Sequence, residues 1–175
     1  VLALLDEALV DDVEHLQERH VRGDVVRGVL DEAPLHVAAG LAPFLDYLEH
    51  LRFADDDLEY LRSLNVFEND FLAYLRKFKP SCTVRAVPEG TLVFPHEPIV
   101  QIEGALFEAQ LLETALLNML NFQTLIATKA ARVCLAADGD PVMEFGLRRA
   151  HGPDGGLSGS RAAYIGGCTS TSNVL

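Results

Sequence analysis

The sequence predicts an α+β N-terminal region followed by the first βαβ unit of an α/β barrel, which the 175 residues leave incomplete. Apolar residues recur at helical spacing along most of the first 138 residues, and a short stretch at Thr83–Glu103 alternates with period two. An apolar run, Pro141–Met143, then leads through a Gly-rich turn into a short helix at Ser158–Tyr164. Strand, Gly-rich turn and helix in this order are how α/β folds place a site at the carboxyl end of a strand.

We divide the chain into three segments. Residues 1–36 hold an N-terminal helix and an unassigned stretch, residues 37–138 form a mixed helical and small antiparallel β region, and residues 139–175 begin the α/β barrel. Such a barrel usually takes about 250 residues. Because few residues follow Asp140, we expect the chain to be a fragment or a truncated form of a longer protein.

The charge balance restricts the possible partners. There are 14 Lys and Arg residues against 26 Asp and Glu, a formal net charge of −12. Nucleic acids and anionic membrane surfaces both select basic faces, so the composition argues against each of them. An anionic small molecule remains possible, but it requires a local basic site within an acidic protein.

Cysteine usage and hydropathy indicate a cytoplasmic protein. Cys82, Cys134 and Cys168 are widely spaced, with no CxxC pair, and are interpreted as free thiols of a reducing compartment. The N-terminal apolar stretch is broken by acidic residues and lacks the basic region of a signal peptide. No window has the uninterrupted apolar length of a membrane span.

Five helical segments are expected before the barrel. They are Val1–His20, Leu41–Leu51, Leu58–Leu64, Asn69–Phe78 and Leu106–Ala137, the last one as two segments that break near Asn121–Thr124. The acidic triplet Asp55–Asp57 suits a helix N-terminus, where carboxylates cap free N–H groups and meet the positive end of the dipole. A calcium loop would need alternating oxygen ligands and a glycine, which the triplet lacks.

Short strands are expected in the middle of the chain and at the start of the barrel. Thr83–Val87, Thr91–Phe94 and Ile99–Glu103 are separated by proline-containing turns and predict a three-stranded antiparallel unit. The pair His96-Glu97 in the second turn is interpreted as solvated. Val142–Phe145 predicts a buried strand.

Two arginines follow that strand directly. The planar guanidinium groups of Arg148 and Arg149 can each donate two parallel hydrogen bonds to a carboxylate or phosphate. We expect them to point into a cleft shared with the loop Gly152–Gly156, where a helix start adds free N–H groups. The alternative, a solvated strand edge with one ion pair, is slightly favoured by the spacing alone.

A longer pattern around the arginines resembles a known family. Phe145–Ala150 reads FGLRRA and His151–Gly156 reads HGPDGG, and together they resemble the signature of nicotinate phosphoribosyltransferases. The similarity continues through Ala162–Gly167 and Thr171–Leu175, and it runs back to about Val37. The resemblance implies a type II phosphoribosyltransferase-like fold.

The resemblance also implies an activity. Members join nicotinate to phosphoribosyl pyrophosphate (PRPP), giving nicotinate mononucleotide and pyrophosphate, the entry step of NAD biosynthesis from nicotinic acid. ATP is hydrolysed as a co-substrate, Mg²⁺ accompanies the phosphates, and no organic cofactor is tightly bound. The full-length protein is expected to be a homodimer.

Site residues follow from the same resemblance. Gly146 and Leu147 would shape the pocket wall, while Arg148 and Arg149 would bind an anionic group of PRPP or the nicotinate carboxylate. Ser172 and Asn173, at the next strand end, are further candidates, and an ordinary polar strand terminus is their alternative.

The family's other functional groups are not matched in this chain. Its phosphorylated histidine lies in a segment beyond position 175, so catalytic residues stay unassigned and His151 is not given that role. The tyrosine segment that opens the family is not recognisable in residues 1–36. We therefore expect the chain alone to be inactive.

Two other hypotheses about the function remain. One is a quinolinate- or nicotinamide-type phosphoribosyltransferase of related architecture, although the run from Arg148 to Gly155 argues against both. The other is a non-catalytic truncated module that keeps the N-terminal region as a dimer surface.

Overall fold

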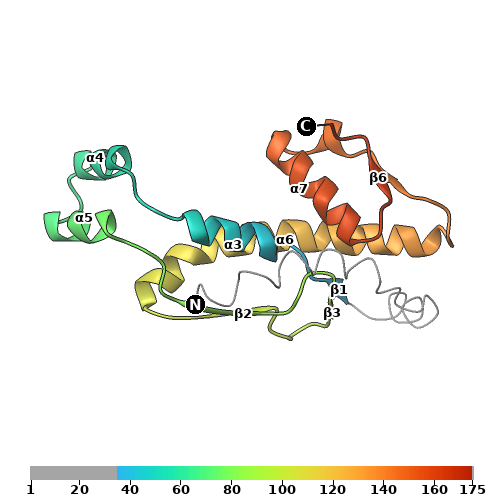
Figure 1. Cartoon of the computed structure of the whole chain (residues 1–175), viewed down its shortest axis with the longest axis horizontal. Helices are drawn as coiled ribbons and strands as arrows, with labels where there is room; N and C mark the ends of the chain where they lie inside the picture. Colours follow the sequence, from blue (N-terminus) through green and yellow to red (C-terminus); the bar gives the residue numbers. More distant parts are fainter. Residues whose placement is uncertain (1–34, 175) are drawn as a thin grey trace.

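The computed structural model describes residues 35–174, so the predicted helix Val1–His20 lies outside the described residues. One long helix, α6, runs through the molecule, and the other elements are arranged around it (Figure 1). In chain order the elements are β1 (His36–Val37), α3 (Leu41–His50), α4 (Asp55–Ser63), α5 (Asn69–Arg76), β2 (Thr83–Ala86), β3 (Leu92–Val93), β4 (Val100–Glu103), α6 (Leu106–Ala136), β5 (Met143–Glu144), the 3₁₀ turn η2 (Leu147–Arg149), α7 (Gly152–Ile165) and β6 (Ser170–Thr171).

Helix α6 is continuous over 31 residues, so the predicted break near Asn121–Thr124 is wrong. The polar residues that suggested a break have partners inside the protein. The Thr124 hydroxyl bonds both the N–H and the carbonyl of Ala39, each at 3.1 Å, and Gln123 accepts a bond from Arg161. The helix contains no proline or glycine, and therefore nothing local interrupts its hydrogen bonds.

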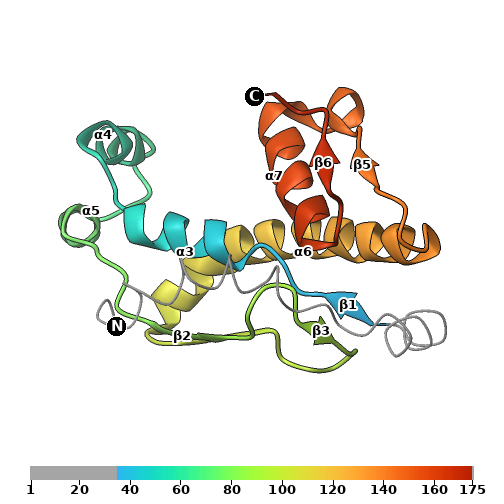
Figure 2. The same ribbon diagram turned by 45° about the vertical axis from the view of Figure 1, so that its right-hand side comes forward.

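Helices α3 and α7 pack against α6 at different points along its length (Figure 2). Near α3 the core contains the large side chains Phe44, Leu112 and Leu120. Near α7 it is built from small residues, and Ala127 and Ala162 are fully buried. Small residues let two helix backbones approach closely, and this close approach fixes the position of α7.

The strands in the middle of the chain pair differently from the prediction. Strands β2 and β4 are antiparallel, with Thr83 opposite Glu103 and Ala86 opposite Val100. Strand β3 pairs instead with β1, so the predicted single three-stranded unit is wrong. The reason is that β1 is anchored on α6, where the Val37 N–H donates to the Thr128 hydroxyl at 2.9 Å, and it offers β3 a free edge.

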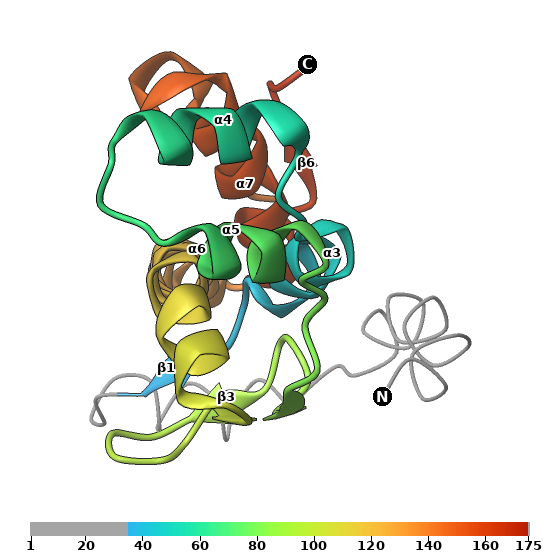
Figure 3. The same cartoon turned by 90° about the vertical axis from the view of Figure 1, so that its left-hand side faces the viewer.

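Helices α4 and α5 form a hairpin that extends away from the rest of the molecule (Figure 1) and faces the viewer in Figure 3. The helix predicted from Leu58 begins earlier, because Asp55–Asp57 form its first turn. Asp57 accepts the N–H of Ala54 at 2.8 Å, which confirms the capping role of the triplet. Edge-to-face contacts of Phe107 with Tyr74 and Phe78 join the hairpin to the start of α6.

Strands β5 and β6 are parallel and are connected through α7, which is the predicted βαβ arrangement. The strand predicted as buried is half open to solvent, since Met143 is 52% exposed and Phe145 is 56% exposed. Only one face of this two-stranded sheet is covered, where Val142 packs on Ala130 and Cys168. Alternate side chains on a strand point to opposite faces, so the others point outward.

Helix α7 starts at Gly152, six residues before the predicted start at Ser158. The Gly-rich stretch Gly152–Gly156 is therefore the first turn of the helix and not a loop, which corrects the prediction. Proline at position 153 fits this turn because the first N–H groups of a helix have no partner within the helix. Among residues 35–174, no helix is long and apolar enough to cross a membrane.

Candidate functional site at the strand ends

The carboxyl ends of β5 and β6 meet at one edge of the sheet, and the side chain of Glu144 lies between them. Its carboxylate accepts hydrogen bonds from the Thr171 hydroxyl at 2.7 Å and the Ser160 hydroxyl at 2.9 Å. The Gly146 N–H donates to the other carboxylate oxygen. Three elements, β6, α7 and the turn after β5, are thus joined through one side chain.

The same network reaches both predicted residues at the second strand end. The Ser172 N–H donates to the main-chain carbonyl of Glu144 at 2.9 Å. The Asn173 amide nitrogen donates to Ser160 Oγ at 3.2 Å, and its N–H donates to Thr171 Oγ1 at 3.0 Å. The structure therefore brings Gly146, Ser172 and Asn173 together at one edge.

The environment of Glu144 keeps it ionised. Partial burial raises the pKa of its carboxyl, but the hydrogen bonds from Thr171, Gly146 and Ser160 stabilise the charged form more strongly. The net result is a pKa below the usual value. At neutral pH the carboxylate is therefore charged, and its oxygens are occupied by donors of the protein.

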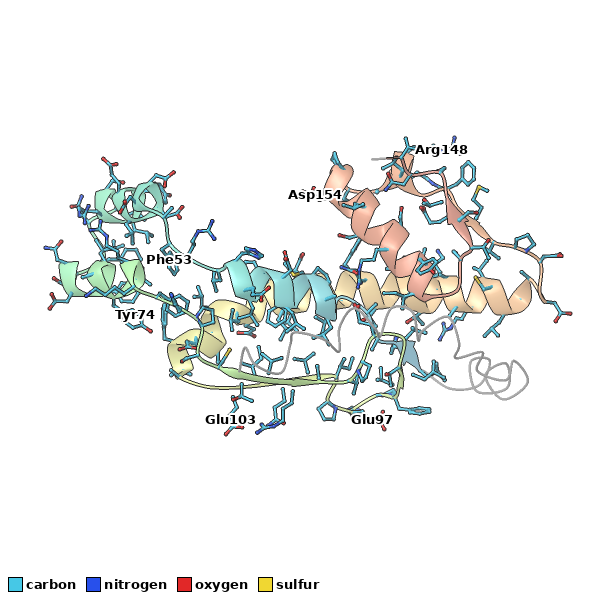
Figure 4. All side chains as sticks on the ribbon, viewed as in Figure 1. Phe53, Tyr74, Glu97, Glu103, Arg148 and Asp154 are labelled. Atoms are coloured by element: carbon cyan, nitrogen blue, oxygen red, sulfur yellow. The ribbon has the colours of Figure 1, made fainter. Side chains whose placement is uncertain are left out.

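The predicted arginines lie just beyond this network. Arg148 and Arg149 are in η2, both are exposed, and Figure 4 shows Arg148 at the outer end of the βαβ unit. Leu147 is half-buried where η2 packs on α7. The exposed guanidinium groups are free to meet an anion from solvent. A cleft shared with residues 152–156 remains a prediction.

An open groove of about 690 Å³ separates α3 from the first turns of α7. Tyr47, Arg52, Asp154 and Ser158 contribute to its walls, and neither Arg148 nor Arg149 does. It is broad and open on one side, unlike the enclosed clefts that bury most of a small ligand. We therefore place the candidate site at the strand ends and not in this groove.

A second polar cluster connects the two halves of the chain. Arg161 of α7 donates to Glu89 at 2.9 Å and to Gln123 at 3.0 Å. Glu89 in turn accepts the N–H groups of Gly40 and Leu41 at the start of α3. The cluster fixes α7 relative to α3 and α6, and hence fixes where the strand ends lie.

Sequence reasoning missed Glu144, Ser160, Thr171 and Arg161 as parts of this architecture. A carboxylate in the last position of a strand, two residues before a glycine, was the available signal for Glu144. Its partners could not be chosen from the sequence because many hydroxyl residues follow it. Among the residues that the structure describes, no group of three or more His, Cys, Asp or Glu side chains is placed to hold a metal ion.

The fold and this edge define an α/β protein in which an α+β region precedes a βαβ unit with a polar site at its strand ends. A family model, the nicotinate phosphoribosyltransferase (NAPRTase) N-terminal domain, matches residues 13–121. Since this match covers more than half of the sequence, the chain belongs to the nicotinate phosphoribosyltransferase family.

Individual relatives agree with the family assignment. A nicotinate phosphoribosyltransferase of Bacillus subtilis is 49% identical over 138 residues, covering 79% of this chain and 28% of the relative. One from Mycobacterium tuberculosis is 48% identical over 139 residues, covering 79% of this chain and 30% of the relative. The chain thus spans less than a third of the length of these relatives.

Two solved structures resemble the fold. Human nicotinic acid phosphoribosyltransferase aligns with a TM-score of 0.74 and 43% identity, over 81% of this chain and 29% of the human one. The nicotinate-nucleotide pyrophosphorylase of Pyrococcus furiosus aligns with a TM-score of 0.61 and 28% identity, over 94% of this chain and 40% of that one. These neighbours confirm the predicted fold family.

Proposed function

We propose that the chain forms part of a nicotinate phosphoribosyltransferase, which makes nicotinate mononucleotide and pyrophosphate from nicotinate and PRPP with coupled ATP hydrolysis. The observation that carries the proposal is that residues of the family's sequence pattern lie at a polar site formed by the ends of two strands. Arg148 and Arg149 extend into solvent beside the ends of two parallel strands. A barrel of this type binds its substrates at that face.

The proposed role of the arginines is to neutralise and orient an anionic substrate group. Both substrates are anionic, while the chain as a whole is acidic, so a local basic site is required. A guanidinium group can hold a phosphate or carboxylate by two parallel bonds, which fixes its direction as well as its charge. Displacement at the anomeric carbon of PRPP depends on such positioning.

The other predicted residues would support this role. Gly146 and Leu147 form the turn that carries the arginines, and Leu147 packs this turn on α7. Ser172 and Asn173 end the neighbouring strand and supply polar groups beside the substrate. In this chain they belong to the hydrogen-bonded edge around Glu144, and their direct contact with substrate is part of the proposal.

Mg²⁺ and ATP enter the proposal as companions of the substrates. The Glu144 carboxylate is occupied by three protein donors, so it does not fit the role of a metal ligand here. We therefore place Mg²⁺ on the phosphates of PRPP and ATP and assign it no ligand in this chain. A homodimer and a cytoplasmic location complete the proposal.

The test is an assay of the protein extended to the length of its relatives, with nicotinate, PRPP, ATP and Mg²⁺. Chromatographic detection of nicotinate mononucleotide, reduced in Arg148→Ala, is the expected result. Product formation only when quinolinate or nicotinamide replaces nicotinate would support the neighbouring enzymes instead. A folded, stable oligomer that neither binds nor turns over any of these substrates would support the interaction module.

A further inference from the structure

We propose that Glu144 is a positioning residue, which holds the arginine-bearing turn and the end of β6 in one fixed arrangement. The proposal deepens the proposed function and rests on it, because it concerns the same strand-end site. Glu144 itself contacts no substrate in this proposal. It acts through Gly146 on one side and through Ser172 and Asn173 on the other.

The first step is the connection from Glu144 to the arginines. Its carboxylate accepts the Gly146 N–H, and the Gly146 carbonyl in turn accepts the N–H of Arg149 at 2.9 Å. The position of Gly146 therefore sets the start of η2. A Cβ at position 146 would lie 2.6 Å from a Glu144 carboxylate oxygen, so a larger residue there would require the carboxylate to shift.

The second step is the connection from Glu144 to the neighbouring strand. Its carboxylate accepts a hydrogen bond from the Thr171 hydroxyl, and its main-chain carbonyl accepts one from the N–H of Ser172. Ser160 of α7 donates to the same carboxylate oxygen as Thr171 and also accepts the amide of Asn173. Side chain and backbone of one residue thus fix both strand ends and the helix between them.

The third step concerns the charge. A carboxylate that accepts several hydrogen bonds holds its donors more strongly than a neutral group does, because such bonds are charge-assisted. The negative charge is balanced by hydrogen-bond donors and not by a cation, since neither Arg148 nor Arg149 forms a described ion pair with Glu144. The guanidinium groups therefore stay available for substrate while their turn is held in place.

The experiment compares Glu144→Ala with Glu108→Ala. Glu108 is a matched control: it is buried, accepts the Ser81 N–H at 2.9 Å and the Ser81 hydroxyl at 2.7 Å, and also has a lowered pKa because these bonds outweigh burial. It lies at the start of α6, away from the strand ends. Both variants lose charge-assisted bonds and both should melt at a lower temperature.

Kinetics of the enzyme at the length of its relatives separate positioning from stability. Misplacing reacting groups by about 1 Å can cost on the order of 100-fold in rate. We expect kcat/KM for PRPP to fall by at least roughly tenfold in Glu144→Ala, with Glu144→Gln intermediate, and by less than about twofold in Glu108→Ala. Equal losses in Glu144→Ala and Glu108→Ala, at equal folded fractions, would overturn the proposal.

Hydrogen exchange of the 175-residue chain gives a readout that needs no activity. In Glu144→Ala the amides of Gly146, Arg149 and Ser172 should exchange faster, while those in the centre of α6 keep their protection. Unchanged exchange at Gly146 and Ser172 contradicts the proposal. If the unmodified longer enzyme is inactive, the proposed function fails, and the exchange result alone decides whether Glu144 holds the strand ends.

Discussion

Glu144 combines a structural task with a titratable charge, so its contribution to stability depends on pH. Because its folded-state pKa is lowered, the bonds it accepts stabilise the folded protein fully above the unfolded-state pKa, whose ordinary value is 4.5. As pH falls through the folded-state value, that stabilisation is lost. Below that pH the carboxyl is protonated in the folded protein, and its hydrogen-bond donors lose their charged acceptor.

The lowered pKa predicts how the difference in stability between wild type and Glu144→Gln changes with pH. The gap in free energy of unfolding should be constant above about pH 6 and should shrink as pH falls below about 4.5. Chemical denaturation at a series of pH values measures it, and the other acidic groups cancel in the difference. A gap that widens toward low pH would mean that the carboxylate is unfavourable in the folded state.

Cys168 is expected to be an unreactive thiol. It is buried, and burial together with Cys134, whose sulfur lies 4.0 Å away, raises the pKa of Cys168 to about 11. At pH 9 a thiol of ordinary pKa is half ionised, so Cys168 should carry roughly 50-fold less of the reactive thiolate. Mass spectrometry of iodoacetamide labelling checks this, and rapid labelling of Cys168 in the folded chain at pH 9 would contradict it.

Arg148 is the residue whose loss should affect binding most directly. Its side chain is exposed, so Arg148→Ala removes a donor without opening a cavity. In the enzyme at the length of its relatives, affinity for PRPP or nicotinate should fall by roughly 1.5–3 kcal/mol, about ten- to 150-fold in Kd. Isothermal titration measures the affinity for each substrate. The control is Arg85→Ala, which removes an exposed arginine of β2 that is paired with Glu103 of β4. Unchanged affinities in both Arg148→Ala and Arg149→Ala would refute the site assignment.

At the scale of elements, the close approach of α7 to α6 depends on Gly166. A Cβ there would lie 2.7 Å from the Ala130 Cβ and closer still to the Ala127 carbonyl oxygen. Gly166 has an ordinary helical φ of −76°, so alanine would be strained by contact and not by backbone conformation. Neither the backbone of α6 nor a buried alanine can yield easily in a close-packed interface.

Two glycine-to-alanine changes in and after α7 should therefore have opposite effects. Gly166→Ala should lower the free energy of unfolding by about 1–3 kcal/mol through overpacking. Gly159→Ala, whose new Cβ would make an ordinary 3.5 Å contact with Ile126, should raise it by up to about 1 kcal/mol through helix propensity. Thermal and urea denaturation of both variants measures the difference. An increase in both variants would show that helix propensity, and not the contact with α6, decides.

The predictable parts of the fold were those with a local cause. Helix α3 was predicted from Leu41, where it begins, and the acidic triplet marks the first turn of α4, because apolar spacing and capping act over a few residues. The pairing of β3 was not predictable in this way, since β1 is two residues long and lies far away in the sequence. The break expected in α6 failed because Gln123 and Thr124 have partners in other elements.

The candidate site also combines features that have a local cause in the sequence with features that depend on distant residues. The arginines follow the strand within a few residues, so sequence alone predicted that they lie at a strand end, and in the structure they belong to the turn η2. Glu144 could not be assigned a role, because its side-chain partners Ser160 and Thr171 lie 16 and 27 residues further along the chain. Only the parallel pairing of β5 with β6 brings those residues together. Contacts of this kind follow from topology and not from spacing.

At the scale of the whole molecule, the described residues leave large apolar side chains in solvent. The exposed fractions are 61% for Leu125 and 48% for Val133 on α6, 52% for Met143, 56% for Phe145 and 57% for Leu157 on α7. Large apolar side chains exposed to solvent favour association, and the short strands β5 and β6 add unpaired edges. The chain spans less than a third of its relatives, so residues outside it are available to cover these faces in a longer protein.

We therefore expect the 175-residue chain to associate and not to turn over nicotinate with PRPP and ATP. Barrel enzymes draw their sites from several strand ends, and residues 35–174 contain only the two ends of β5 and β6. Sedimentation velocity and binding of an apolar dye measure the association. Leu125→Lys combined with Val133→Lys should reduce both while α6 keeps its helical signal, since both side chains are exposed on that helix. Exposed Glu113→Lys is the control for added charge. Turnover by the chain above the level of Arg148→Ala, from a monodisperse monomer, would show that two strand ends suffice for the chemistry.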